Sequence, residues 1–144
     1  ILVIHGLGMN MRGKVMLDRF GPSVLADYER KIAEFASELD VHVEMFTSNL
    51  EGKVIDKFYE AHDGNVDAAI INPAGYMIGY PGLTAAISQV RFPTIEVHVT
   101  NPASRGSVSE IASACRGVIT GFGIYGYSLA LRAALSLVSE TTST

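Results

Sequence analysis

A chain of 144 residues, 48% of them hydrophobic, has the length of one ordinary domain and can bury a core without disulfides. The net charge of −4 and the scattered Lys and Arg residues exclude a basic surface for nucleic acid. No apolar run is long enough for a membrane span or a signal segment, and Cys115, the single cysteine, has no internal disulfide partner. We therefore expect a soluble cytoplasmic protein with no nucleic-acid partner and no membrane partner.

Five short apolar runs rich in β-branched residues predict strands. Most of the runs are continuously apolar, which indicates strands that are covered on both faces of a sheet. The runs fall at residues 2–5, 41–47, 68–72, 94–100 and 117–120.

The segments between these runs carry apolar residues at helical spacing. Two of them begin with a Ser-x-x-Glu capping-box pattern, at Ser48 with Glu51 and at Ser107 with Glu110. Alternation of strand and helix requires right-handed crossovers, so the fold class is α/β with a parallel sheet between two layers of helices. We expect one domain over residues 1–138 and a frayed polar tail over 139–144. The helical stripes lie at residues 25–39, 51–58, 83–90 and 127–138, and another helix begins before residue 111.

In such a sheet, ligands bind beyond the carboxyl ends of the strands. Four loops are expected at that rim, at residues 5–21, 72–81, 98–107 and 121–126. The first loop is long for a connection between a strand and a helix, which indicates a lid or a binding loop.

Two glycine-rich motifs at this rim do not have the context that their usual chemistry needs. The G-x-G-x-x-G pattern at 121–126 follows the last predicted strand instead of the first, so it indicates a tight turn and not a dinucleotide site. The 5–8 segment is similar to an oxyanion loop, but no G-x-S-x-G accompanies it, so an esterase is not expected. No Cys and His cluster has the spacing of metal ligands, and we expect neither a metal nor another cofactor.

Glu96 and His98 lie two residues apart in a predicted strand and therefore share one face of the sheet. A carboxylate beside an imidazole fixes its tautomer and stabilises the protonated form, which suits a general acid. Taken alone, such a pair is more often a satisfied polar contact than a catalyst. Thr100, Asn101 and Arg105 follow it, and their amide, hydroxyl and guanidinium groups are suited to binding a carboxylate or a polyol.

Asn72 ends the preceding predicted strand in a similar way. It begins the sequence Asn-Pro-Ala-Gly-Tyr, in which an asparagine side chain often bonds its own backbone in a turn. The coincidence of several polar strand ends on one rim favours a binding site over independent turns.

Four segments together, at residues 48–56, 71–76, 96–101 and 121–131, resemble the type II 3-dehydroquinate dehydratases, and the likeness covers nearly the whole chain. The resemblance implies a flavodoxin-like three-layer sandwich with a five-stranded parallel sheet. It also implies a lyase of the shikimate and quinate pathways that self-associates into trimers and a dodecamer. By the same resemblance, His98 protonates the leaving hydroxyl and Glu96 orients His98. The resemblance assigns substrate binding to Asn72, Gly75, Thr100, Asn101 and Arg105.

The first loop departs from the family pattern. The family usually has an asparagine at Gly8, an arginine near Val15 and its catalytic tyrosine base at Phe20. Phenylalanine has no ionisable group and cannot accept a proton. The family's second-loop histidine falls on Ile78, and the stretch after Arg105 is shorter than usual.

Replacement groups for the missing base are sought among Tyr76, Tyr80, Arg12 and Arg19, although tyrosines near turns usually pack their rings and loop arginines are usually solvated. We interpret the chain as a lyase that acts on a small, oxygen-rich cyclic carboxylate, such as 3-dehydroquinate or a relative, with altered base chemistry. The first alternative is a catalytically impaired family member that binds a ligand or serves assembly. The second is an ordinary 3-dehydroquinate dehydratase. The sequence leaves the substrate, the replacement base and the oligomer size open.

Overall fold

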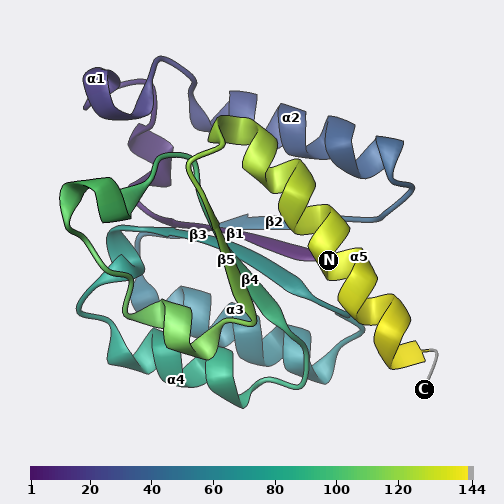
Figure 1. Ribbon diagram of the computed structural model, residues 1–144. Coiled ribbons are helices and arrows are strands. Elements are labelled where there is room, and N and C mark those ends of the chain that lie inside the picture. Colours follow the sequence, from purple (N-terminus) through teal and green to yellow (C-terminus); the bar gives the residue numbers. More distant parts are fainter. Residues whose placement is uncertain (143–144) are drawn as a thin grey trace.

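A five-stranded parallel sheet, in the order β2-β1-β3-β4-β5, forms the middle layer of the structure (Figure 1). The structure is a computed structural model that describes residues 1–142 of the chain. All four neighbouring strand pairs are parallel. The prediction of a five-stranded parallel sheet is thus confirmed. The strands are β1 (Leu2–Leu7), β2 (Glu44–Thr47), β3 (Ala69–Ala74), β4 (Thr94–His98) and β5 (Gly117–Thr120).

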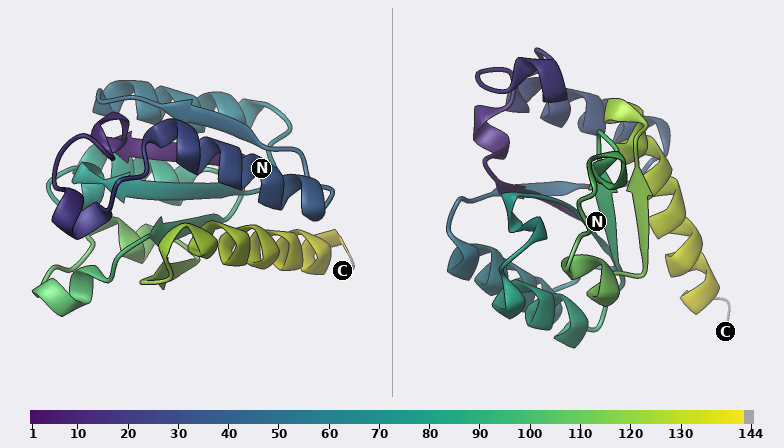
Figure 2. Two further views of the ribbon diagram at one scale, coloured as in Figure 1. Left: turned by 90° about the horizontal axis from the view of Figure 1, so that it is seen from above. Right: turned by 60° about the vertical axis from the view of Figure 1, so that its left-hand side comes forward.

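Helices cover both faces of this sheet, as Figures 1 and 2 show. One face packs against α2 (Leu25–Glu38) and α5 (Gly126–Thr142). The other packs against α3 (Glu51–Asp63) and α4 (Pro81–Gln89). No helix within residues 1–142 is both long and apolar enough to cross a membrane.

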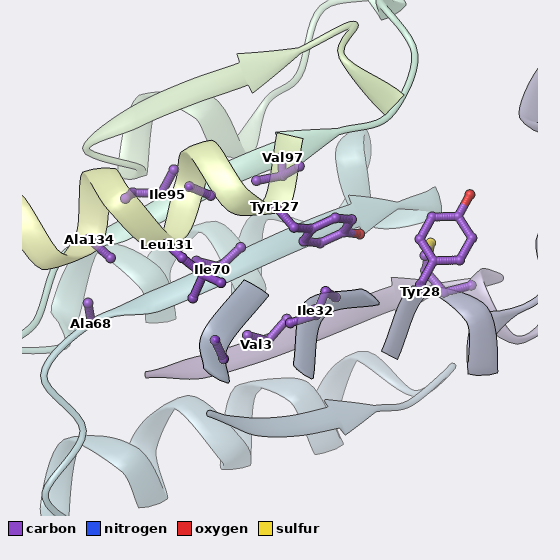
Figure 3. Packing of buried hydrophobic residues seen from close by; sticks show 13 residues of the cluster. Val3, Tyr28, Ile32, Ala68, Ile70, Ile95, Val97, Tyr127, Leu131 and Ala134 are labelled. Carbon is purple, nitrogen blue, oxygen red and sulfur yellow. The ribbon is translucent and has the colours of Figure 1, made fainter. Parts of the chain in front are cut away.

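The alternation of side chains along each strand divides the core into two clusters. Val3, Ile70 and Val97 point toward α2 and α5, where Figure 3 shows them close to Ile32 and Leu131. The intervening strand residues, such as Ile4 and Ile71, point toward α3 and α4. Burial of apolar surface on both faces is the main force that holds the three layers together.

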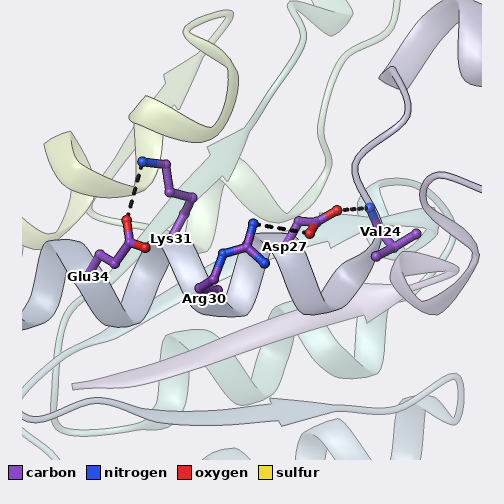
Figure 4. Close-up of polar contacts among 5 residues, drawn as sticks. All are labelled: Val24, Asp27, Arg30, Lys31 and Glu34. Carbon is purple, nitrogen blue, oxygen red and sulfur yellow. Dashed lines mark hydrogen bonds and ion pairs between the residues drawn. The ribbon is translucent and has the colours of Figure 1, made fainter.

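The outer surface of α2 carries polar contacts that fix its first turn (Figure 4). Asp27 Oδ2 accepts a hydrogen bond from the Val24 backbone N–H at 2.9 Å, and its other oxygen pairs with Arg30 at 3.2 Å. Lys31 and Glu34 form a second pair at 3.3 Å. Exposed ion pairs of this kind contribute at most about 1 kcal/mol each, so the apolar face of the helix is the main source of its stability.

Three predicted boundaries need correction. The strand expected at 94–100 ends at His98. The strand expected at 41–47 begins only at Glu44, although Val41 and Val43 still pack against the core beside α2. The tail expected to fray at 139–144 instead continues α5 as far as Thr142, and residues 143 and 144 lie outside the described part of the chain. Ser139 and Glu140 are polar, but the helix continues through them.

Both predicted capping boxes are wrong. Ser48 accepts a hydrogen bond from the backbone N–H two residues further on and does not cap α3, and Glu51 accepts one from the backbone of α4. Glu110 accepts a hydrogen bond from the Gly79 backbone N–H at 2.9 Å, and the helix after it, η4 (Ile111–Ala114), is one 3-10 turn. In both places the glutamate accepts a hydrogen bond from a segment that is distant in the sequence and does not cap the helix that begins there.

β1 and β3 approach each other very closely near their carboxyl ends. A Cβ atom on Gly6 would lie 2.1 Å from the carbonyl oxygen of Pro73 and 2.7 Å from that of Asn72. Only glycine fits this approach. Beyond it the chain enters the long loop that contains η1 (Met9–Met11) and α1 (Leu17–Phe20), which stands outside the sheet at upper left in Figure 1.

We therefore predict that Gly6→Ala destabilises the protein by about 3 kcal/mol or more, because the new methyl group meets backbone atoms that cannot rotate away. The free energy of unfolding from denaturant titration measures the effect. Gly52→Ala is the matched control. No atom lies within 4 Å of a Cβ at that exposed helical position, so alanine should be neutral or slightly stabilising there. Equal stability of the two variants would contradict the prediction.

Candidate functional site

A cavity of about 360 Å³ lies at the carboxyl ends of β1, β3 and β4. One wall is the loop with η1 and α1, and the facing wall includes η3 (Pro102–Arg105), at the same end of the sheet in Figure 1. Segments that are far apart in the sequence therefore meet at the carboxyl ends of the strands, as expected from the sequence. The residues singled out from the sequence that line the cavity are Gly8, Arg12, Val15, Arg19, Phe20, Asn72, Gly75, His98, Thr100 and Arg105.

His98 and Glu96 form a buried pair at the end of β4. His98 Nε2 is hydrogen-bonded to Glu96 Oε2 because alternate residues of the strand face the same side. Glu96 is fully buried, while His98 is 7% exposed and lines the cavity. The carboxylate therefore orients the imidazole from behind, and Nδ1 remains as the ring nitrogen that can exchange a proton with a ligand.

Arg105 and Thr100 form a polar pair on the wall that follows β4. Arg105 Nη1 donates a hydrogen bond to Thr100 Oγ1 at 3.1 Å, and both residues line the cavity. The other guanidinium N–H groups are suited to bind a carboxylate. Asn101, which the resemblance assigns to substrate binding, precedes η3 and is not among the residues that line the cavity.

Asn72 is held at the cavity by two hydrogen bonds. Its Nδ2 donates to the Tyr127 hydroxyl at 2.9 Å, and its Oδ1 accepts from the Ala74 backbone N–H at 3.2 Å. Asn72 therefore forms the turn expected from the sequence and lines the cavity as well. Ala74 has a φ of 48°, a conformation that costs a non-glycine residue on the order of 1–3 kcal/mol. The sequence indicated Tyr127 only as a core residue of a helix, so its contact with Asn72 was missed.

Tyr76 and Tyr80 lie outside the cavity lining, so the structure corrects the expectation that either replaces the base. Tyr76 is fully buried between α3 and α4 and donates its hydroxyl hydrogen to the Ser48 carbonyl at 2.9 Å. Its ring meets that of Tyr80 edge-on, with the centroids 4.9 Å apart. Burial raises the pKa of Tyr76 further from neutrality, which makes it a poorer base.

The loop wall is apolar where the resemblance implies a base. Val15 and Phe20 line the cavity, and neither can exchange a proton. Gly8 has a φ of 86°, and its backbone N–H donates to Asn49 Oδ1 at 2.9 Å. A left-handed backbone of this kind suits glycine at the position where the resemblance implies asparagine.

The two arginines of this loop occupy different environments. Arg12 is only 7% exposed, and its guanidinium carbon lies 3.5 Å from the centre of the Phe20 ring. Arg19 is exposed and lies 5.9 Å from the same ring. A guanidinium stays protonated in proteins, so neither can replace the base.

The cavity has a cationic lining within an acidic protein. Arg12, Arg19, His98 and Arg105 are the ionisable side chains that line it, and no Asp or Glu lies among its described lining residues. A cleft lined by one sign of charge attracts ligands of the opposite sign. No group of three or more His, Cys, Asp or Glu side chains within the described residues is placed to hold a metal ion.

His5 is a buried residue of this region that was not among the site residues expected from the sequence. It pairs with Asn72 in the register of β1 and β3, and its ring meets Tyr127 edge-on at 6.4 Å. Neither ring nitrogen has a hydrogen-bond partner among the described residues, and burial lowers the His5 pKa to about 4. Its position at a strand end was the one available signal.

A parallel sheet of this strand order, covered on both faces and with a cavity at the strand ends, defines the flavodoxin-like α/β class. The sequence model described as Dehydroquinase class II matches residues 1–135. The chain belongs to this family.

Individual relatives agree with this assignment. The 3-dehydroquinate dehydratase of Desulforudis audaxviator is 42% identical over 143 residues, which cover 97% of this chain and 95% of the relative. The crystal structure of type II dehydroquinase from Butyrivibrio crossotus matches with a TM-score of 0.88 and 30% identity over 92% of this chain and 94% of that one. A 3-dehydroquinate dehydratase-like protein from Bifidobacterium longum matches with a TM-score of 0.74 and 27% identity over 96% and 97% of the two chains.

His5 should make the stability of the protein depend on pH. Its pKa is 6.5 in an ordinary environment and about 4 in the folded protein, so between these values the unfolded chain binds more protons. The contribution is complete above pH 6.5 and falls by about 1.4 kcal/mol per pH unit toward pH 4.

We expect the wild type to lose about 3 kcal/mol more unfolding free energy between pH 7 and pH 4 than His5→Gln does. Denaturant titrations of both proteins at the two pH values measure this difference. Because the carboxylates are common to both proteins, their titration cancels. Parallel pH profiles would show that the imidazole is not held neutral.

Proposed function

We propose that the protein is a carbon-oxygen lyase that dehydrates 3-dehydroquinate or a closely related cyclic carboxylate. The observation that carries this proposal is that the His98–Glu96 pair and the Arg105–Thr100 pair border one cavity. The first pair supplies a proton donor and the second an anion anchor. The family and the names of the relatives support the same reaction.

In the proposed reaction, Arg105 and Thr100 bind the carboxylate of the substrate. Asn72, fixed by Tyr127, presents its amide to the polar side of the ring. Protonated His98 gives its proton to the departing hydroxyl group, which leaves as water. A carbon–hydrogen bond next to the ketone breaks as the new double bond forms, and its proton passes to a base.

Whether the cavity contains such a base decides between an active lyase and a catalytically impaired relative. Among the described cavity-lining residues, His98 is the one side chain that ordinarily exchanges a proton near neutral pH. The acid half of the reaction therefore has a candidate residue, while the base half has no second one. The same observation favours the alternative of a catalytically impaired relative that binds a ligand or serves assembly.

We also propose that the protein works in the cytoplasm as a trimer or a dodecamer. Large apolar side chains are exposed around β5, which forms one edge of the sheet. Val118, Phe122 and Tyr125 are 45%, 61% and 55% exposed. Edge strands with exposed apolar residues are commonly covered by another chain.

Turnover of 3-dehydroquinate should be weak but dependent on His98. Loss of a general base typically lowers a rate by about 100- to 10,000-fold, so we expect the wild type to be slower than ordinary family members by at least about 100-fold. His98→Ala should reduce the remaining rate by a further factor of about 100 or more. Ultraviolet absorbance of the conjugated enone product follows the reaction. A wild-type rate within about tenfold of ordinary members would contradict our interpretation of the loop.

Two substitutions test whether the base alone is missing. Phe20→Tyr by itself should help little, because a phenol with a pKa near 10 is mostly protonated at neutral pH. Adding Val15→Arg should raise the rate further, by about 10-fold per unit that the guanidinium lowers the phenol pKa. If the activity found for this protein survives His98→Ala undiminished, the His98–Glu96 pair is structural and the lyase proposal fails.

The assembly proposal predicts a mass of three or twelve times 15.4 kDa by light scattering at micromolar concentration. Phe122→Asp should shift the mass downward, because a carboxylate in an apolar contact is unfavourable. Val108→Asp, at an apolar position that is 78% exposed and outside β5, is the comparison variant. A monomer mass for the wild type would exclude the assembly.

A further inference from the structure

Arg12 is a buried cation for which the proposed reaction has no role. It follows η1 in the long first loop and is 7% exposed. Arginine is rarely buried to this extent unless a partner neutralises its charge. The groups around Arg12 therefore indicate which anionic ligand could neutralise its charge.

The protein holds the guanidinium in place without neutralising it. Phe20 covers one face, with the guanidinium carbon 3.5 Å from the ring centre. Tyr28 contributes a hydrogen bond, and Tyr28 and Tyr127 offset only part of the lowering of the Arg12 pKa by burial. Within residues 1–142, Arg12 forms no ion pair, and its Nη1 is buried without a hydrogen-bond partner. An unpaired donor on a buried cation is costly unless a ligand satisfies it.

Another guanidinium, that of Arg105, lines the same cavity on the opposite wall. Arg105 lines it beside Thr100, and Arg19 lines it from an exposed position of the first loop. The pKa of Arg12 is lowered mainly by burial and to a smaller extent by the positive charge of Arg105. Two like charges that face one cavity repel each other, and a ligand with two negative charges offsets that repulsion more fully than a monoanion does. The volume of about 360 Å³ is at the small end of ligand pockets, which suits a single ring with short substituents.

We infer that the cavity binds a small cyclic ligand with two acid groups, the first on Arg105 and Thr100 and the second on Arg12. This inference rests on the proposed function, which supplies the first anchor, and it narrows the proposed substrate class to cyclic carboxylates that carry a second acid group. The second group is a carboxylate or a phosphate-like acid, since a guanidinium donates paired hydrogen bonds to either.

Three benzene acids test the inference on the intact protein by titration calorimetry. Benzoate carries one acid group, isophthalate carries two carboxylates, and 3-phosphonobenzoate carries a carboxylate and a phosphonate. We expect at least one of the two diacids to bind the wild type about tenfold or more tightly than benzoate, because it satisfies the second cation. The preferred diacid distinguishes a carboxylate from a phosphate-like second group.

Substitutions locate the second group. Arg12→Gln should remove the preference for the diacid over benzoate, whereas Arg12→Lys should keep part of the preference. Lys14→Gln removes the same charge from an exposed position of the same loop that does not line the cavity, and it should keep the full preference. Arg105→Gln should weaken all three ligands, because it removes the shared anchor.

The outcomes separate this inference from the proposed function. Equal wild-type affinity for benzoate and both diacids overturns the inference, and this comparison needs no variant to fold. A preference that survives in folded Arg12→Gln overturns it as well. If benzoate binding does not depend on Arg105, the carboxylate anchor of the proposed function fails instead. If none of the three acids binds at millimolar concentration, the inference and the carboxylate anchor at Arg105 both fail, while turnover of 3-dehydroquinate still tests the lyase proposal separately.

Discussion

The close approach of β1 to β3 at Gly6 is the constraint on which the cavity depends. The carbonyl groups of Pro73 and Asn72 occupy the space of a side chain at Gly6, so the two strands end side by side. This contact sets His5 opposite Asn72, where both lie near Tyr127 of α5. The contact at Gly6 thus fixes the position of Asn72, which lines the cavity and bonds to Tyr127 of α5.

Phe20 connects the two unusual properties of the cavity. Its ring lacks the ionisable group that the resemblance implies at this position, which removes a base from the loop wall. The same ring lies against the Arg12 guanidinium and holds a positive charge inside the protein. The absence of a base from the loop wall and the burial of the Arg12 charge therefore both involve one side chain, while His98 and Glu96 form their pair on β4.

The sequence predicted those features that depend on local periodicity. Apolar runs predicted all five strands, and alternation along one strand predicted that Glu96 and His98 share a face. Features that depend on long-range contacts were not predictable. Glu51 bonds the backbone of α4 instead of its own helix, and Tyr76 turns into the core. The burial of Arg12 follows from the path of an irregular loop, for which periodicity gives no signal.

The buried guanidinium also places the molecule in a trade-off between stability and selectivity. Desolvation of a charge without a counter-ion destabilises the folded state, so an apolar side chain at Arg12 would be expected to give a more stable protein with a less selective cavity. Binding of an anion at such a site forms new contacts and also removes the cost of the unpaired buried charge. The ligand-free protein is therefore pre-organised at the expense of its own folding stability, and its resistance to heat and proteolysis becomes a readout of ligand binding.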